Sequence, residues 1–132
     1  MGVKTVEDLL AFQLAVEFKL EVYRLVRGCP QAIDYKYQSQ LFDAASGVEA
    51  NLAEGFKRNV PGEFFQFVRY AAASLAEART RLGDGIHREY FSQEDCRAAL
   101  SLGKRSADAV AALQRSLSPF LKRNRDSRTR RS

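Results

Sequence analysis

Apolar side chains recur along this chain at intervals of three and four residues, the spacing of an amphipathic helix. In the first segment, Leu9, Phe12 and Val16 continue into Leu20 and Tyr23 at this spacing. No segment of any length alternates with the period of a strand. The pattern predicts four helices, over residues 6–27, 35–55, 61–82 and 92–118.

Capping signals mark where these helices begin. Thr5 with Asp8, and Ser92 with Asp95, have the spacing of a capping box with Asp in place of Glu. Pro61 suits the first turn of the third helix, because the N–H group that proline lacks would have no helical partner there.

Glycine and proline mark where the helices are expected to end. Gly28 stops the first helix, and Gly55 stands where a left-handed residue would end the second. An Asp-Gly pair at Gly85 is expected to break the third. Pro119 predicts that the fourth helix kinks or stops near Ser118.

Four helices joined by short loops predict an all-α fold, an antiparallel up-down-up-down four-helix bundle in a single domain. The 132 residues can form one core without metal or disulfide staples. We expect the bundle to occupy residues 1–121 and a basic, flexible C-terminal tail to occupy residues 122–132.

In this topology, facing positions of the second and third helices sum to about 118. The rule places Ala44 opposite Ser74 and Gly47 opposite Ala71. The runs 44–47 and 71–74 consist of small residues, so they are predicted to face each other at the closest helix approach in the bundle.

The first helix carries two apolar stripes, more than a simple bundle requires. Either this helix lies deep in the bundle or one stripe faces another subunit, and the second alternative is favoured. Phe12, Phe65 and Phe67 are expected to support the same assembly. The candidate oligomer interface is the second stripe, Leu10, Leu14, Phe18, Val22 and Leu25.

The net charge of +5 is concentrated at the C-terminus. Residues 122–132 hold six basic side chains against one acid, Asp126, and residues 1–121 are neutral overall. Such a tail is typical of an arm that binds nucleic acid, and equally of a disordered end that aids solubility. Candidate nucleic-acid contacts, expected at one end of the bundle, are Lys57, Arg58, Lys122, Arg123, Arg125, Arg128, Arg130 and Arg131.

The sequence offers little for catalysis. His87 is the one histidine and is expected to be exposed in a loop. Cys29 and Cys96 have no ligand at metal-binding spacing and are expected to stay reduced. There is no Gly-x-Ser-x-Gly and no phosphate-binding glycine loop. We therefore expect no enzyme activity, metal or cofactor. With no signal peptide and no apolar run of membrane-spanning length, we expect a cytoplasmic protein without membrane contact.

Two polar pairs lie beside the apolar stripes of the middle helices: Asn51 with Glu54, and Ser74 with Glu77. One interpretation makes Glu54 an acid or base. The favoured one is structural: Asn51 bonds a neighbouring helix, Glu54 meets Arg58 or an interface arginine, and the pairs fix helix register. Glu54 and Glu77 would lie roughly 20 Å apart along the bundle, too far to share a metal.

The block Asn51-Leu52-Ala53-Glu54-Gly55, with Ser74 and Glu77 downstream, resembles the 23S rRNA intervening-sequence (S23) protein family over residues 6–115. The resemblance implies a bacterial cytosolic four-helix bundle that assembles as a ring-like pentamer and has no established enzymatic activity. One related branch assists a retroelement reverse transcriptase through a basic surface that engages RNA and the enzyme. This chain departs from the family pattern at Phe42-Asp43 and at Arg79-Thr80-Arg81.

The expected function is a non-enzymatic, oligomeric scaffold that binds structured RNA or a nucleic-acid enzyme through its basic surface and tail. The alternative is a protein–protein interaction scaffold with no nucleic-acid role.

Overall fold

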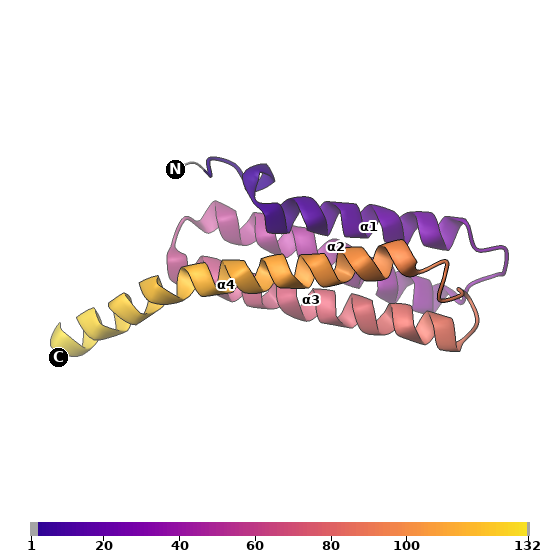
Figure 1. Cartoon of the computed structure of the whole chain (residues 1–132). Coiled ribbons are helices and arrows are strands. Elements are labelled where there is room, and N and C mark those ends of the chain that lie inside the picture. The colour runs from indigo at the N-terminus through magenta and orange to yellow at the C-terminus, as the bar shows by residue number, and fades with distance from the viewer. Residues whose placement is uncertain (1–2, 132) are drawn as a thin grey trace.

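The computed structural model describes the backbone of residues 3–131 and the side chains of residues 3–121. A short 3-10 turn, η1 (Val6–Asp8), precedes four helices that run alternately up and down (Figure 1). Each helix packs against two neighbours, and in the described residues the backbones of the diagonal pairs do not approach closely. This confirms the predicted antiparallel four-helix bundle. The helices are α1 (Leu10–Arg27), α2 (Tyr35–Arg58), α3 (Pro61–His87) and α4 (Arg97–Arg131).

The core is a single cluster to which all four helices contribute. Its largest fully buried apolar side chains include Phe18, Leu41, Leu52 and Leu82. Burying one such side chain contributes about 1.5–3 kcal/mol to the free energy of unfolding, so this cluster dominates the stability of the bundle.

The second stripe of α1 belongs to this core, which corrects the predicted oligomer interface. Leu14 is 4% exposed, and Phe18 and Val22 are fully buried within the single chain. They cannot contact another subunit, because α2 and α4 already cover that face of α1. Leu10 is 61% exposed and Leu25 is half-buried, so only these two members of the second stripe reach the surface. In the other stripe, Leu20 is 47% exposed.

Two glycines that were expected to end helices instead lie inside them. α2 continues past Gly55 to Arg58 and ends at Asn59, which takes the left-handed conformation with φ 58°. α3 continues past Gly85 to His87. A Cβ at Gly55 would lie 2.6 Å from the Cβ of Phe67, and one at Gly85 would lie 2.8 Å from the Phe91 ring. Both positions therefore require glycine, because the side chains of Phe67 and Phe91 pack directly against the helix backbone there.

The predicted starts of α2 at Tyr35 and of α3 at Pro61 are confirmed, whereas α4 begins at Arg97 and not at residue 92. Ser92 and Asp95 form the reciprocal capping box, with the Asp95 N–H donating to Ser92 Oγ at 3.0 Å. Asp8 accepts from the backbone N–H of Thr5 at 3.0 Å, but η1 ends there and α1 begins only at Leu10. The backbone N–H groups of Thr5 and Lys4 both donate to the Asp8 carboxylate and lower its pKa.

Pro119 does not stop α4. The helix passes through it to Arg131, and its last part extends beyond the other three helices (Figure 1). A proline inside a helix removes one backbone hydrogen bond. The neighbouring side chains at this point are exposed, so the interruption lies at the surface and not in the core.

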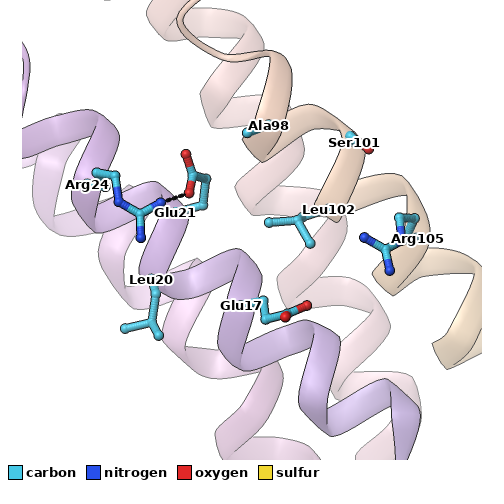
Figure 2. Close-up of a pocket in the computed structure, with 8 residues that line it drawn as sticks. All are labelled: Glu17, Leu20, Glu21, Arg24, Ala98, Ser101, Leu102 and Arg105. Carbon is cyan, nitrogen blue, oxygen red and sulfur yellow. Dashed lines mark hydrogen bonds and ion pairs between the residues drawn. The ribbon is translucent and has the colours of Figure 1, made fainter.

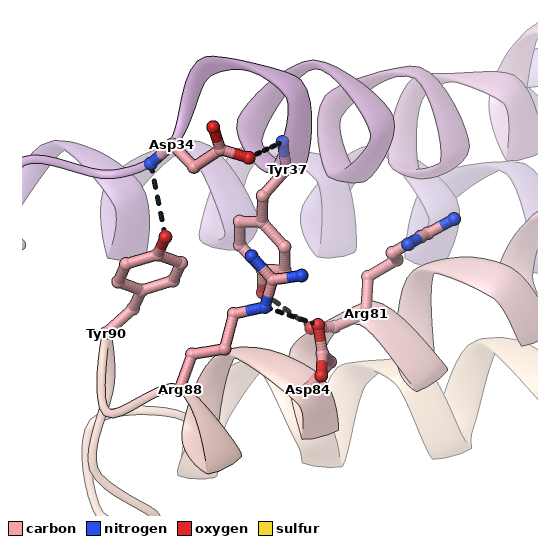
Figure 3. Close-up of polar contacts among 6 residues, drawn as sticks. All are labelled: Asp34, Tyr37, Arg81, Asp84, Arg88 and Tyr90. Atoms are coloured by element: carbon pink, nitrogen blue, oxygen red, sulfur yellow. Dashed lines mark hydrogen bonds and ion pairs between the residues drawn. The ribbon is translucent and has the colours of Figure 1, made fainter.

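The packing of α2 on α3 follows the predicted register closely. The Tyr37 hydroxyl donates to the Arg81 carbonyl at 2.5 Å (Figure 3), and these two positions sum to the predicted 118. Gly47 meets Ser74 instead of Ala71, a shift of less than one helical turn. Ala72 and Ala73 do not face α2: Ala72 lines a groove against α4, and Ala73 is exposed.

Candidate nucleic-acid interface

The two basic residues of the α2–α3 turn are paired with acids. Arg58 lies 3.0 Å from Glu54 and 3.9 Å from Glu63, and Lys57 lies 3.6 Å from Glu54. The expected contact between Glu54 and Arg58 is confirmed. Exposed pairs of this kind add little stability, but they leave the four side chains with no net charge. The turn therefore has less positive charge to offer a polyanion than its two basic residues suggest.

The other predicted basic residues belong to the last part of α4. Their backbone is helical as far as Arg131, while their side chains lie outside the described residues. The predicted contacts there are Lys122, Arg123, Arg125, Arg128, Arg130 and Arg131.

A further basic surface, which sequence reasoning missed, runs along α3 and α4. Arg69 and Arg79 on α3 and Arg115 on α4 are all exposed. Among the residues whose side chains are described, none of these three arginines forms an ion pair. We call Arg69, Arg79 and Arg115 the α3–α4 basic face. Of these three arginines, only Arg79 stood out in the sequence, because it lies in the segment Arg79-Thr80-Arg81 that departs from the family pattern.

Small side chains shape this face. Ala72 and Ala76 of α3 and Ala107 and Ala111 of α4 line a shallow groove of about 90 Å³ that Arg79 borders. Arg79 reaches toward α4, since a Cβ at Gly103 would lie 3.2 Å from its Cγ. At helical spacing, Arg69 falls on the row of Ala72 and Ala76, and Arg115 on the row of Ala111. Because small side chains border Arg79, its exposed guanidinium can reach phosphate oxygens.

The family-type polar residues follow the outer seam between α2 and α3. The Asn51 amide donates to the Gly47 carbonyl at 2.8 Å, a bond within its own helix, so the expected bond to a neighbouring helix is wrong. Ser74 packs against Gly47, where a Cβ would lie 3.0 Å from its hydroxyl. Glu77 is exposed and forms no bond to Gln40 in the described part of the chain. The register of α2 against α3 is fixed instead by the packing of Ser74 on Gly47 and of Phe67 on Gly55.

A larger groove separates α1 from α4 (Figure 2). Leu20 of α1 is 47% exposed at its edge, and Leu102 of α4 points across toward α1. Glu17, Glu21 and Arg105 add charge of both signs to the walls. A concave surface with an exposed leucine and charged walls can take a side chain of another protein. This groove replaces the buried stripe of α1 as the candidate assembly surface.

The two groups with the most strongly raised pKa values, Tyr37 and Cys96, are buried in the core. Burial, with the nearby Asp84 carboxylate second, raises the pKa of Tyr37 well above its ordinary value. Burial raises the pKa of the Cys96 thiol to about 11. Asp84 accepts from Arg88 at 2.9 Å (Figure 3), and His87 is exposed as the last residue of α3 instead of lying in a loop. The described residues contain no group of three or more His, Cys, Asp or Glu side chains arranged to hold a metal ion.

Known proteins similar in sequence identify the family of this chain. The sequence model described as 23S rRNA-intervening sequence protein matches residues 7–112. The chain belongs to this family. The resemblance based on residues 51–55, Ser74 and Glu77 is therefore confirmed. Comparison with curated proteins gave no match.

A solved structure with the same fold supports the architecture of this intervening-sequence family member. It is a protein of unknown function from the S23 ribosomal protein family of Bacteroides thetaiotaomicron, with a TM-score of 0.73 and 14% sequence identity. The match covers 80% of this chain and 98% of that one. In the part of the chain that the structure describes, no helix combines the length and apolar character needed to cross a membrane.

Proposed function

We propose that this protein is a non-enzymatic scaffold that binds structured RNA through the α3–α4 basic face and the basic run that follows it. The observation that carries the proposal is that Arg69, Arg79 and Arg115 are exposed and form no ion pair among the described side chains. They lie on α3 and α4, and α4 continues beyond Leu121 into the basic run. Positive charge without acidic partners is what a phosphate backbone requires.

The character of the surface favours recognition of backbone and shape over recognition of bases. No aromatic side chain lines the groove beside Arg79, so the groove offers no platform for base stacking. Binding should therefore depend steeply on salt, because each phosphate contact releases counterions.

Fluorescence anisotropy with an RNA hairpin, across a salt series, tests this function. We expect the full chain to bind at low salt and a chain ending at Leu121 to bind more weakly, with a shallower salt slope. The slope should fall by about 0.7–0.9 for each phosphate contact that the basic run supplied. Absence of binding by the full chain at low salt would refute the RNA-binding function.

We also propose that the scaffold is a homo-oligomer, with five copies as the family resemblance implies. Leu10 and Leu20 support assembly, because these large apolar side chains of α1 are 61% and 47% exposed in the single chain. Light scattering at high salt measures the mass of the particle. A monomeric mass across micromolar concentrations would contradict the assembly.

The alternative function, a scaffold for proteins without any nucleic acid, is favoured by the α1–α4 groove alone. A nucleic-acid enzyme or another protein would then be the partner. That function predicts a stable oligomer. Its Leu20→Lys variant should lose binding of the partner protein, whereas neutralising the α3–α4 basic face should leave that binding unchanged. Capture of a defined partner under those conditions, together with no RNA binding, would favour it over our proposal.

A further inference from the structure

A second kind of site lies at the end of the bundle where the α2–α3 turn meets α4. There the surface forms a hollow of about 420 Å³. It is separate from the α3–α4 basic face, with which it shares no residue. We call it the end hollow, and its lining residues are Val3, Lys4, Phe56, Asn59, Val60, Pro61, Phe64, Leu117 and Phe120.

The walls of the end hollow are apolar and partly open to water. Val3, Val60 and Phe120 are 51%, 46% and 46% exposed. Phe56 and Phe64 meet edge to face with ring centroids 5.9 Å apart, which gives the hollow a firm aromatic wall. Exposed apolar side chains gathered in a concave site, instead of scattered over the surface, are typical of a ligand pocket.

The charge at the hollow has one sign. Lys4 is the one ionisable side chain among its lining residues, and no carboxylate lines it. Leu121, which lies near Gly62 at the same end, is followed in the sequence by Lys122 and Arg123. An apolar hollow with a cation at its edge favours a molecule with an apolar chain and a single negative head group.

The volume is sufficient for such a molecule. An enclosed apolar cavity of about 150 Å³ holds benzene, so an open hollow of about 420 Å³ is large enough to take an apolar chain of about ten carbons. We propose that the end hollow binds a medium-chain fatty acid, with its chain against Phe56, Phe64 and Val60 and its carboxylate beside Lys4. This proposal does not depend on the RNA-binding function.

Isothermal titration calorimetry of the full chain with decanoate, below its micelle concentration, tests the proposal. We expect saturable binding with one decanoate per chain. Decyltrimethylammonium, which has a chain of the same length and the opposite charge, should bind at least about tenfold more weakly. Lys4→Gln should weaken decanoate binding by about two- to fivefold, the range expected for one exposed ion pair, and leave decanol binding unchanged.

Matched variants locate the site. Val60→Glu places a carboxylate in the hollow and should weaken decanoate binding at least about tenfold, and Phe120→Glu tests a second wall in the same way. Leu20→Glu is the control, because Leu20 is 47% exposed, like Val60 at 46%, but lies in the α1–α4 groove. Thermal melts establish that each variant is folded. No saturable binding, equal binding of the cationic ligand, or equal loss in Leu20→Glu and Val60→Glu would overturn the proposal.

Discussion

At the scale of single residues, glycines show how strongly packing controls this bundle. Gly55 and Gly85 lie in the interiors of α2 and α3, where a Cβ would collide with neighbouring side chains. Gly83 lies in the same helix as Gly85, yet a Cβ there would have nothing within 4 Å. The same residue type therefore has opposite energetic roles two positions apart.

Alanine substitution should reveal this contrast. Gly85→Ala places a methyl group against Phe91 and the Tyr37 hydroxyl, and should lower the free energy of unfolding by about 1–3 kcal/mol through overpacking. Gly55→Ala should do the same against Phe67. Gly83→Ala, the matched control, should raise the free energy of unfolding by about 0.5–1 kcal/mol, because alanine favours a helix. Urea unfolding measures all three, and stabilisation by Gly85→Ala would contradict the packing account.

The two cysteines should differ in reactivity. Cys96 is fully buried and its pKa is raised to about 11, whereas Cys29 is half-buried and contacts the Tyr90 carbonyl at 3.1 Å. Only a thiolate reacts rapidly with a disulfide reagent. Labelling at pH 8 should therefore modify Cys29 in the native protein and reach Cys96 only in denaturant, while Cys29→Ser should abolish native labelling. Rapid native labelling of the Cys29→Ser variant would show that Cys96 is accessible.

At the scale of elements, the sequence predicted the helix starts better than their ends. Pro61 fits the first turn of α3 because the N–H that it lacks would have no helical partner there. Ser92 and Asp95 bond each other locally, just before α4 begins at Arg97. Such effects can be read from a few adjacent residues. Gly55 and Gly85 could not be interpreted in this way, because a glycine that ends a helix and one that admits a neighbouring helix look alike in sequence. The choice depends on side chains such as Phe67, which is distant in the chain.

The same limit explains the misplaced interface on α1. Both apolar stripes have helical spacing, and spacing alone does not tell which stripe faces the core. The structure buries Phe18 and Val22 and leaves Leu20 at the surface. The basic face was missed because it is made by residues of two helices that lie far apart in the sequence: Arg69 and Arg79 are on α3 and Arg115 is on α4.

The contact between the start of α2 and the end of α3 depends on the Tyr37 hydroxyl. Tyr37→Phe removes its bond to the Arg81 carbonyl and should lower the free energy of unfolding by about 0.5–1.5 kcal/mol. Tyr35→Phe is the control, because Tyr35 is 82% exposed. Thermal or urea unfolding of both variants measures the difference, and an equal effect would contradict the assignment.

The raised pKa of Tyr37 also predicts a pH dependence. Folding favours the neutral phenol, so this contribution is fully present below the ordinary tyrosine pKa of about 10 and is lost as pH rises above it. The free energy of unfolding should therefore fall with pH above about 10, and less steeply in Tyr37→Phe than in Tyr35→Phe. If the free energy of unfolding falls equally steeply with pH in the two variants, Tyr37 is not the source of the pH dependence.

At the scale of the whole molecule, charge is distributed in a way that composition did not show. Residues 1–121 are neutral overall, yet Arg58 and Lys57 are neutralised by neighbours while Arg69, Arg79 and Arg115 are not. The bundle therefore has a positive side despite its balanced total. This side adjoins the helix that continues into the basic run, so both would act on one polyanion.

The most direct test of RNA binding compares two double variants of the full chain that lose the same charge. Arg69→Gln with Arg79→Gln neutralises the α3–α4 basic face, whereas Arg27→Gln with Lys36→Gln removes two exposed cations near the α1–α2 loop. In anisotropy measurements with one RNA hairpin across a salt series, the first pair should weaken binding and reduce the salt slope by about 1.5. The second pair should leave the slope nearly unchanged. Equal slopes for the two variants would contradict a defined RNA surface on α3 and α4.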